Sequence, residues 1–298
     1  MSHIIGIDIG TSGIKVGAMD KEGVLGYLEY QPYSLLYPQM GWVEIDLEDI
    51  WNKTKTLLIK VWRQVEATGT VDAISLSTFC NSSVFLNEKG EPLYPGILYL
   101  DQRSKAEADW IKHLVGEKLL FNVTKNRLEP GMHTITTLLW FKNNHPDQYK
   151  KMYKWGNLST FILNRLTGSF VMDWTQSSFT GMYDVENYRW SSDIYEKVGI
   201  DPEKLPEVVD PCSIIGYYSL PEFASRRVPV IAGAADTACS ATALGIGINE
   251  MFESVGTSNV LTVCTDQPDR LDNRFLNRCH VIKNQWLSHG AMSFPGAA

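Results

Sequence analysis

The chain has 298 residues, with 27 Lys+Arg against 34 Asp+Glu, 44% hydrophobic residues and 20% charged residues. This composition is typical of a globular protein, and it excludes a disordered tail, a collagen-like fibre and a small disulfide-stabilised scaffold. At roughly 150 residues per domain, the length indicates about two domains.

Charge and cysteine usage exclude further classes. The formal net charge of -7 argues against a protein that mainly binds nucleic acid, because phosphate contacts need clustered Lys and Arg side chains. The N-terminus has no signal-peptide pattern, and no apolar run is long enough for a membrane span. The five cysteines lack a C-x-x-C spacing, which disfavours a zinc site and a disulfide framework. We therefore expect a cytoplasmic protein that contacts neither nucleic acid nor membrane.

The chain opens with three predicted strands and a long helix. Residues 4–9 and 14–19 are alternating apolar runs joined by a Gly-Thr-Ser-Gly turn, and residues 24–30 follow a second turn. This pattern predicts an antiparallel meander. Asp46 is then placed to cap an amphipathic helix that ends near Gly69.

Later segments alternate between strands and helices. The predicted strands are 71–76, 84–86 and 228–232, and the predicted helices are 102–114, 134–144 and 158–166. The last of these strands leads into a helix of small residues, and the junction between them falls at Asp236.

The opening pattern returns near the end of the chain. Residues 251–255 and 259–263 are predicted strands around a Gly-Thr-Ser turn, which lies 246 positions after the first such turn. This spacing indicates an internal duplication. We therefore expect one whole domain, residues 1–245, and the first strands of a second, residues 246–298.

The first candidate site is the segment from Asp8 to Lys15. Gly10 allows close approach of a ligand, and the turn N–H groups with the hydroxyls of Thr11 and Ser12 can form an anion-binding nest. Asp8 could hold Mg²⁺ beside a bound phosphate. The alternative is a plain hairpin without a ligand. The Walker pattern and the G-x-G-x-x-G fingerprint are both absent.

Three more segments are candidates, each with a simpler alternative. Asp236 could be a general base aimed at a substrate hydroxyl, or only a helix N-cap. The turn at 256–258 could be a second phosphate nest, or an ordinary hairpin turn. The polar loop 77–83 with Asp101 suits a polyhydroxylated ligand, although Asp101 and Arg103 could instead be a structural pair.

In sequence order these segments resemble the FGGY carbohydrate kinase family. The similarity runs along the whole chain, with most likeness to xylulokinase-like and gluconokinase-like members. The resemblance is carried by residues 5–12 with Lys15, 41–44, 95–103, 233–236 and 255–258. It implies an α/β fold of the duplicated actin-like, ribonuclease H-like type, with the N-terminal domain complete and the C-terminal domain only begun.

The resemblance also implies a role for each candidate residue. Asp236 matches the catalytic carboxylate that accepts the proton of the attacking hydroxyl, and Asp8 matches the acid that organises Mg²⁺. The family's first phosphate-binding motif for ATP corresponds to Gly10, Thr11 and Ser12, and its second to Gly256, Thr257 and Ser258. Lys15 lies where the family often has a basic residue. The sugar-contacting positions correspond to Cys80, Asn81, Asp101 and Asp236.

Two features depart from the family pattern. The sugar loop typically has Met-His where this chain has Cys80-Asn81, and the Trp that commonly precedes the Asp-x-Arg segment is replaced by Tyr99 or Leu100. Both changes alter the surface offered to a sugar. The chain also ends before the family's adenosine-binding segment, so we expect little kinase activity from this polypeptide alone.

These observations predict an ATP- and Mg²⁺-dependent sugar kinase. Xylulose or a related ketopentose is the leading acceptor, and gluconate is the alternative. A non-catalytic sugar-binding or regulatory fragment is the alternative from another class. For the oligomeric state, a homodimer is one alternative.

Overall fold

The computed structural model describes residues 1–223, 226–255 and 258–293. Its main element is a seven-stranded sheet in the order β13-β14-β5-β1-β2-β3, with β15 also paired to β5. The strands are β1 Ser2–Gly10, β2 Gly13–Asp20, β3 Leu25–Pro32, β5 Thr70–Thr78, β13 Ile214–Tyr218, β14 Val228–Ile231 and β15 Ala234–Ala235. The predicted antiparallel meander is confirmed in β1, β2 and β3.

Alternation along β1 decides which face of this sheet is covered. Ile5, Ile7 and Ile9 are buried in the main core, whereas Ile4 and Asp8 are on the other side of the strand and retain exposure. The core face packs against α1 Leu47–Glu66 and α6 Leu158–Thr167. The opposite face therefore stays available around Asp8.

Helix α1 forms as the sequence predicted. The Asp46 side chain accepts hydrogen bonds from the backbone N–H groups of Glu48 and Asp49 at 3.0 Å each. A cap of this kind satisfies N–H groups that have no partner inside the helix. The apolar stripe of the helix is buried against the sheet.

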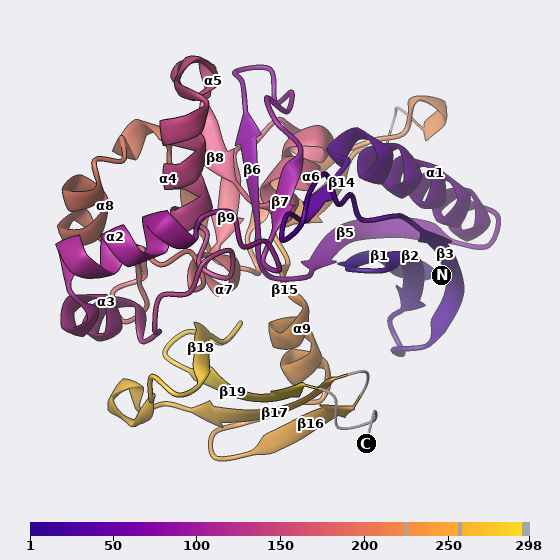
Figure 1. The fold of residues 1–298 in the computed structure, drawn as a ribbon. Coiled ribbons are helices and arrows are strands. Elements are labelled where there is room, and N and C mark those ends of the chain that lie inside the picture. Colours follow the sequence, from indigo (N-terminus) through magenta and orange to yellow (C-terminus); the bar gives the residue numbers. More distant parts are fainter. Residues whose placement is uncertain (224–225, 256–257, 294–298) are drawn as a thin grey trace.

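A second core lies in a mainly helical region beside the sheet (Figure 1). Phe85 and Phe141 stack there with ring centroids 3.9 Å apart. The helices of this region are α2 Lys105–Val115, α3 Glu117–Thr124, α4 Ile135–Asn144, α5 Pro146–Lys151 and α8 Ser192–Val198. Predicted helices 102–114 and 134–144 are confirmed as α2 and α4, while α3, α5 and α8 were not predicted.

Short strands and one short helix connect these two regions. Strands β4 Glu44–Ile45, β7 Gly96–Leu98, β6 Ser82–Leu86 and β8 Lys154–Gly156 form a four-stranded sheet, and β9 Val171–Asp173 pairs with β12 Glu207–Val209. Helix α7 Trp174–Ser177 follows β9 directly. The hairpin of β10 Tyr183–Asp184 and β11 Arg189–Trp190 completes this part.

The last part of the chain forms a separate antiparallel sheet. Helix α9 Asp236–Ala243 leads to it, and its order is β16-β17-β19-β18 (Figure 1). The strands are β16 Met251–Val255, β17 Ser258–Thr265, β18 Leu276–Cys279 and β19 Trp286–Ser293. The predicted hairpin is confirmed in β16 and β17. Its turn residues Gly256 and Thr257 lie outside the described residues.

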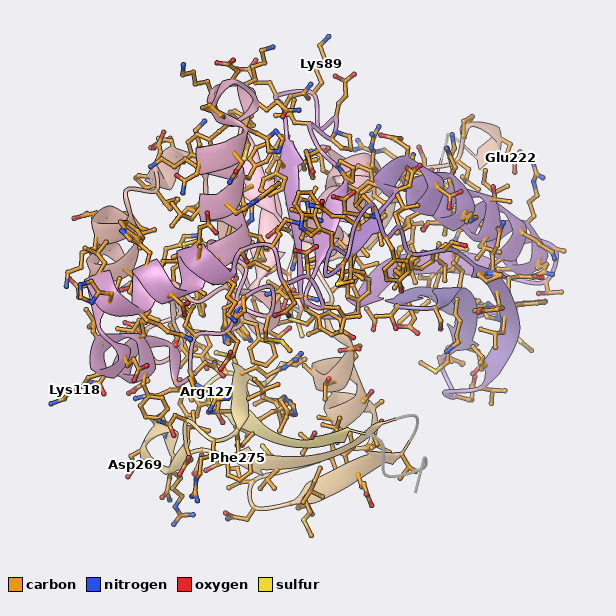
Figure 2. All side chains as sticks on the ribbon, viewed as in Figure 1. Lys89, Lys118, Arg127, Glu222, Asp269 and Phe275 are labelled. Carbon is orange, nitrogen blue, oxygen red and sulfur yellow. The ribbon has the colours of Figure 1, made fainter. Side chains whose placement is uncertain are left out.

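Charged side chains lie mostly at the periphery. Lys89, Lys118, Glu222 and Asp269 are exposed and point outward (Figure 2). Within the described part of the chain, no helix has the length and apolar character needed to cross a membrane.

Candidate active site

Parallel strands bring three of the candidate segments to one edge of the large sheet. Strands β1 and β15 flank β5, and both run parallel to it. Asp8 is paired with Ser77 on one side, and Ala234 is paired with Ser77 on the other. The carboxyl ends of the three strands therefore meet, as is usual for ligand sites in α/β sheets. Asp8, the loop after β5 and Asp236 are placed together by this topology.

Asp8 lies on the open face of the sheet. The Ser77 hydroxyl donates to Asp8 Oδ1 at 3.0 Å, and Lys15 Nζ is 3.9 Å from Asp8 Oδ2. Lys15 comes from β2, directly opposite Asp8 in the antiparallel register. A hollow of about 380 Å³ includes all three residues. The hairpin therefore presents a carboxylate and an ammonium group side by side.

Magnesium fits Asp8 only in one binding mode. The described residues contain no cluster of three or more His, Cys, Asp or Glu side chains suited to a metal. Mg²⁺ is, however, often held by one or two carboxylates with water and phosphate oxygens as the other ligands. The Asp8 side chain is 44% exposed, so one of its oxygens can serve in that way.

Asp236 is the first residue of α9, after the short strand β15. The N-cap position belongs to Ala235, so the alternative that Asp236 is merely the N-cap is wrong. Asp236 Oδ1 accepts from the Thr237 backbone N–H at 2.7 Å and from the Thr237 hydroxyl at 3.1 Å. Burial raises the pKa of Asp236, and the nearby charge of Asp8 adds to this, while Arg278 opposes it. A carboxylate with a raised pKa is suited to accept a proton.

The loop after β5 carries the predicted sugar-contacting pair. Asn81 is completely buried and its Oδ1 accepts from the Ser82 backbone N–H, but its Nδ2 has no hydrogen-bond partner. The peptide bond between Cys80 and Asn81 is cis. Burial raises the pKa of the Cys80 thiol to about 12, so this side chain is neutral at physiological pH.

Asp101 is part of the fold rather than of this site. Its Oδ1 accepts from the backbone N–H and Nε of Arg103, and its Oδ2 accepts from Arg103 Nη2 and the Val43 backbone N–H. Both residues have fully buried side chains. Asp101 and Arg103 therefore form the structural pair that the sequence analysis gave as the alternative. Nothing in this arrangement supports the prediction that Asp101 contacts a sugar.

Helix α7 was missed by the sequence analysis, although it joins the segments of the site. The Thr175 hydroxyl accepts from the Ala235 backbone N–H at 2.9 Å, directly before Asp236. Gln176 Nε2 donates to the Thr78 hydroxyl at 2.7 Å, at the end of β5. An Asp followed by hydroxyl residues at 175, 177 and 178 was the available signal, since such runs favour helix caps and local hydrogen bonds.

A second missed residue is Arg278, on β18 of the small sheet. It is 4% exposed, and its guanidinium carbon lies 4.3 Å from the centre of the Phe179 ring. Its positive charge opposes the rise that burial causes in the pKa values of Cys80, Asp173 and Asp236. The small sheet therefore contributes a cation to the site formed by the large one.

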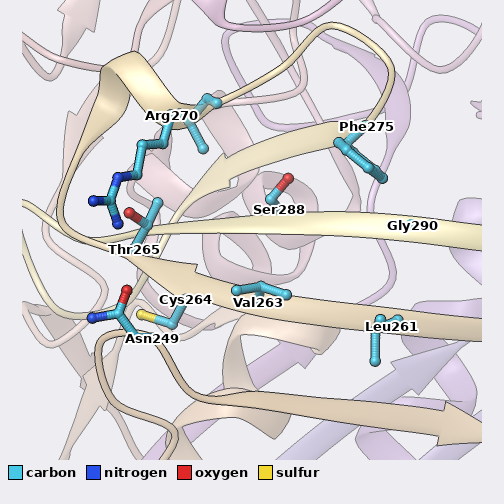
Figure 3. A pocket seen from close by; sticks show the side chains of 10 residues that line it. Asn249, Leu261, Val263, Cys264, Thr265, Arg270, Phe275, Ser288 and Gly290 are labelled. Atoms are coloured by element: carbon cyan, nitrogen blue, oxygen red, sulfur yellow. The ribbon is translucent and has the colours of Figure 1, made fainter.

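A different pocket lies on the small sheet (Figure 3). It has a volume of about 300 Å³ and is lined by apolar residues such as Leu261, Val263 and Phe275, together with Gly290. Its lining includes no carboxylate. Neither Asp8 nor Asp236 therefore belongs to this pocket.

Comparison with known proteins gives a family match over most of the chain. Residues 3–245 match the FGGY family of carbohydrate kinases, N-terminal domain. The chain belongs to this family. It is 30% identical to the xylulose kinase of Staphylococcus xylosus over 297 residues, covering 96% of this chain and 60% of that protein. It is 25% identical to the gluconokinase of Bacillus licheniformis, covering 99% of this chain and 58% of that protein.

Solved structures show the same fold. The xylulose kinase from Rhodospirillum rubrum matches with a TM-score of 0.92 at 22% identity, covering 99% of this FGGY chain and 61% of that one. The xylulose kinase from Brucella ovis matches with a TM-score of 0.90 at 24% identity and similar coverage. The predicted family and fold class are confirmed, and the chain spans about 60% of the length of these relatives.

Proposed function

We propose that this chain carries the acceptor site of an ATP-dependent carbohydrate kinase, with Asp236 as the general base. The observation that supports it most is the meeting of Asp8 and Asp236 at the carboxyl ends of strands flanking β5. One carboxylate is then beside the phosphate turn and the other is free to face a hydroxyl. Kinases that act on small molecules need these two functions, since phosphoryl transfer depends mainly on positioning and charge compensation.

In the proposed reaction, each residue either accepts the proton of the attacking hydroxyl or compensates the negative charge of the phosphate groups. Asp236 accepts the proton of the attacking hydroxyl, and its raised pKa makes that transfer easier. Lys15 and the backbone N–H groups of Gly10, Thr11 and Ser12 stabilise the phosphate oxygens. Asp8 would hold Mg²⁺ through one oxygen, and bound Mg²⁺ neutralises phosphate charge.

The second phosphate turn and the domain division complete the proposal. Gly256 and Thr257 lie outside the described residues, and Ser258 begins β17. We assign all three to the phosphate groups of ATP. The division into residues 1–245 and 246–298, a cytoplasmic location and a homodimer stay predictions.

The base assignment is tested in the full-length protein. Asp236→Asn keeps an oxygen to accept from Thr237 but cannot take a proton, so sugar-dependent ADP formation should fall by about 10²–10⁴-fold. Sugar binding, measured by calorimetry, should persist. Asp109→Asn, on the exposed face of α2, is the control and should retain activity. Unchanged turnover in Asp236→Asn would overturn the assignment.

Two acceptors are proposed. Xylulose or a related ketopentose is supported by the relatives named above, and gluconate is supported by the buried cation Arg278. A panel of sugars and sugar acids assayed with ATP separates them. Sugar binding without ADP formation in the full-length protein would instead indicate a non-catalytic sugar-binding module.

A further inference from the structure

Arg278 is a buried cation, and two of its guanidinium nitrogens have no hydrogen-bond partner in the described part of the chain. Its Nε and Nη1 are both inaccessible to water, and neither donates to any atom of the described structure. A buried charged donor that is left unpaired costs more than an ordinary unmade hydrogen bond. Such a group in a native fold calls for a specific explanation, and an absent ligand is one.

The surrounding backbone holds Arg278 in place on both sides. The Cys279 backbone N–H donates to the Ser178 hydroxyl at 2.9 Å, just after α7. The Asn277 backbone N–H donates to Asn126 Oδ1 at 2.8 Å, and Asn126 Nδ2 donates to the Asn277 carbonyl at 2.7 Å. Strand pairing with Leu287 on β19 adds a third constraint. The guanidinium therefore extends from a fixed strand.

The aromatic ring of Phe179 packs against the guanidinium of Arg278. The guanidinium carbon is 4.3 Å from its centroid, and the rings of His133 and His289 lie 6.1 and 6.5 Å from the same ring. The Nε2 atoms of both histidines are also buried without partners. Burial lowers the pKa of His133 to about 4 and that of His289 as well, so both rings are neutral at physiological pH.

Unpaired donors outnumber unpaired acceptors among these groups. The unpaired Nε and Nη1 atoms of Arg278 carry three N–H groups and Asn81 Nδ2 carries two more, whereas Asp173 Oδ2 is an acceptor when ionised. A ligand that fits must therefore supply acceptor oxygens. A hydroxyl both donates and accepts, while a carboxylate only accepts and matches the planar fork of a guanidinium with two oxygens.

We propose that Arg278 binds a carboxylate of the acceptor, so that this kinase prefers a sugar acid to a neutral sugar or polyol. The inference rests on the proposed function, because it names the substrate class of that same site. Arg278 thereby sets specificity from the small sheet, while Asp236 on α9 accepts the proton from a hydroxyl of the same molecule.

The test compares ligands that differ only at one terminal carbon. Gluconate and glucitol form one pair, xylonate and xylitol the other, and each is titrated by calorimetry into the full-length protein. Two charge-assisted hydrogen bonds predict that each acid binds about 10- to 100-fold more tightly than its polyol. Equal affinity within both pairs would overturn the inference.

Variants identify the residue responsible. Arg278→Gln should remove the preference for the acid, and Arg278→Lys should keep only part of it, since lysine has the charge without the fork. Arg127→Gln is the control, because the Arg127 side chain is 63% exposed and pairs with Glu129. A preference that survives in folded Arg278→Gln overturns the assignment. If that variant does not fold, the Arg278→Lys titrations decide in the same way.

The ADP assay separates this inference from the proposed function. If xylulose is phosphorylated with a higher kcat/KM than gluconate and xylonate, the sugar-acid inference is wrong while the kinase proposal stands. If no acceptor supports ADP formation, the proposed function is wrong. A preference for gluconate over glucitol in both binding and turnover supports both.

Discussion

Asp173 offers a stability test that needs neither ATP nor sugar. Its carboxylate is fully buried at the start of α7, where Oδ1 accepts from the backbone N–H groups of Thr175 and Gln176 at 2.9 and 3.2 Å. Its Oδ2 has no partner. Burial raises the pKa of Asp173 from 3.8 to about 6. Asp173→Asn keeps the capping oxygen and removes the buried charge.

The sign and size of the effect follow from proton binding. Between pH 4 and pH 6 the folded state holds a proton on Asp173 that the unfolded chain has already released, so the free energy of unfolding falls as pH rises. A shift of about two pKa units corresponds to about 3 kcal/mol, fully expressed above pH 6. Asp173→Asn lacks this loss. Relative to the parent chain, it should gain up to about 3 kcal/mol between pH 4 and pH 7.

The measurement is urea unfolding followed by tryptophan fluorescence from pH 4 to pH 7.5, with nine tryptophans as the signal. The control is Asp109→Asn, which removes one exposed carboxylate from α2. The reasoning is refuted if the difference between Asp173→Asn and the parent changes with pH no more than the difference for Asp109→Asn.

Three further outcomes are expected. Gly233→Ala should lower the free energy of unfolding by about 2–4 kcal/mol, because φ is +75° and a Cβ would overlap a main-chain oxygen of β5; Gly116→Ala, with φ +88° and open space, should cost less in the same urea titration. Arg103→Lys should cost about 3 kcal/mol by calorimetric melting, because lysine cannot reproduce the paired hydrogen bonds to Asp101. In a pH–rate profile of the full-length protein, kcat/KM should fall on acidification at a pH above the 3.8 of an ordinary aspartate, because protonated Asp236 cannot act as a base; an acid limb at or below pH 3.8 would contradict this.

Local patterns were sufficient for the elements and for several site residues. The meander β1–β3 follows from alternating apolar residues, and α1 follows from its apolar stripe and the Asp46 cap. Asp8 and Asp236 could be singled out because each lies at a strand end, where a turn or helix begins. Each of these patterns depends on residues that are close together in the sequence, so it can be recognised without the tertiary structure.

Only the tertiary structure decided what these residues face. The sequence could not decide whether Asp101 contacts a ligand or Arg103. Packing of the folded chain buries both side chains and pairs them with each other. The bond between Ser178 and Cys279 joins residues 101 positions apart, and no local pattern marks such a partner. No local pattern singled out Arg278, and the strand that carries it, β18, was not predicted from the sequence. Packing of β18 against α7 buries its guanidinium beside Phe179, and its Nε and Nη1 have no hydrogen-bond partner among the described residues.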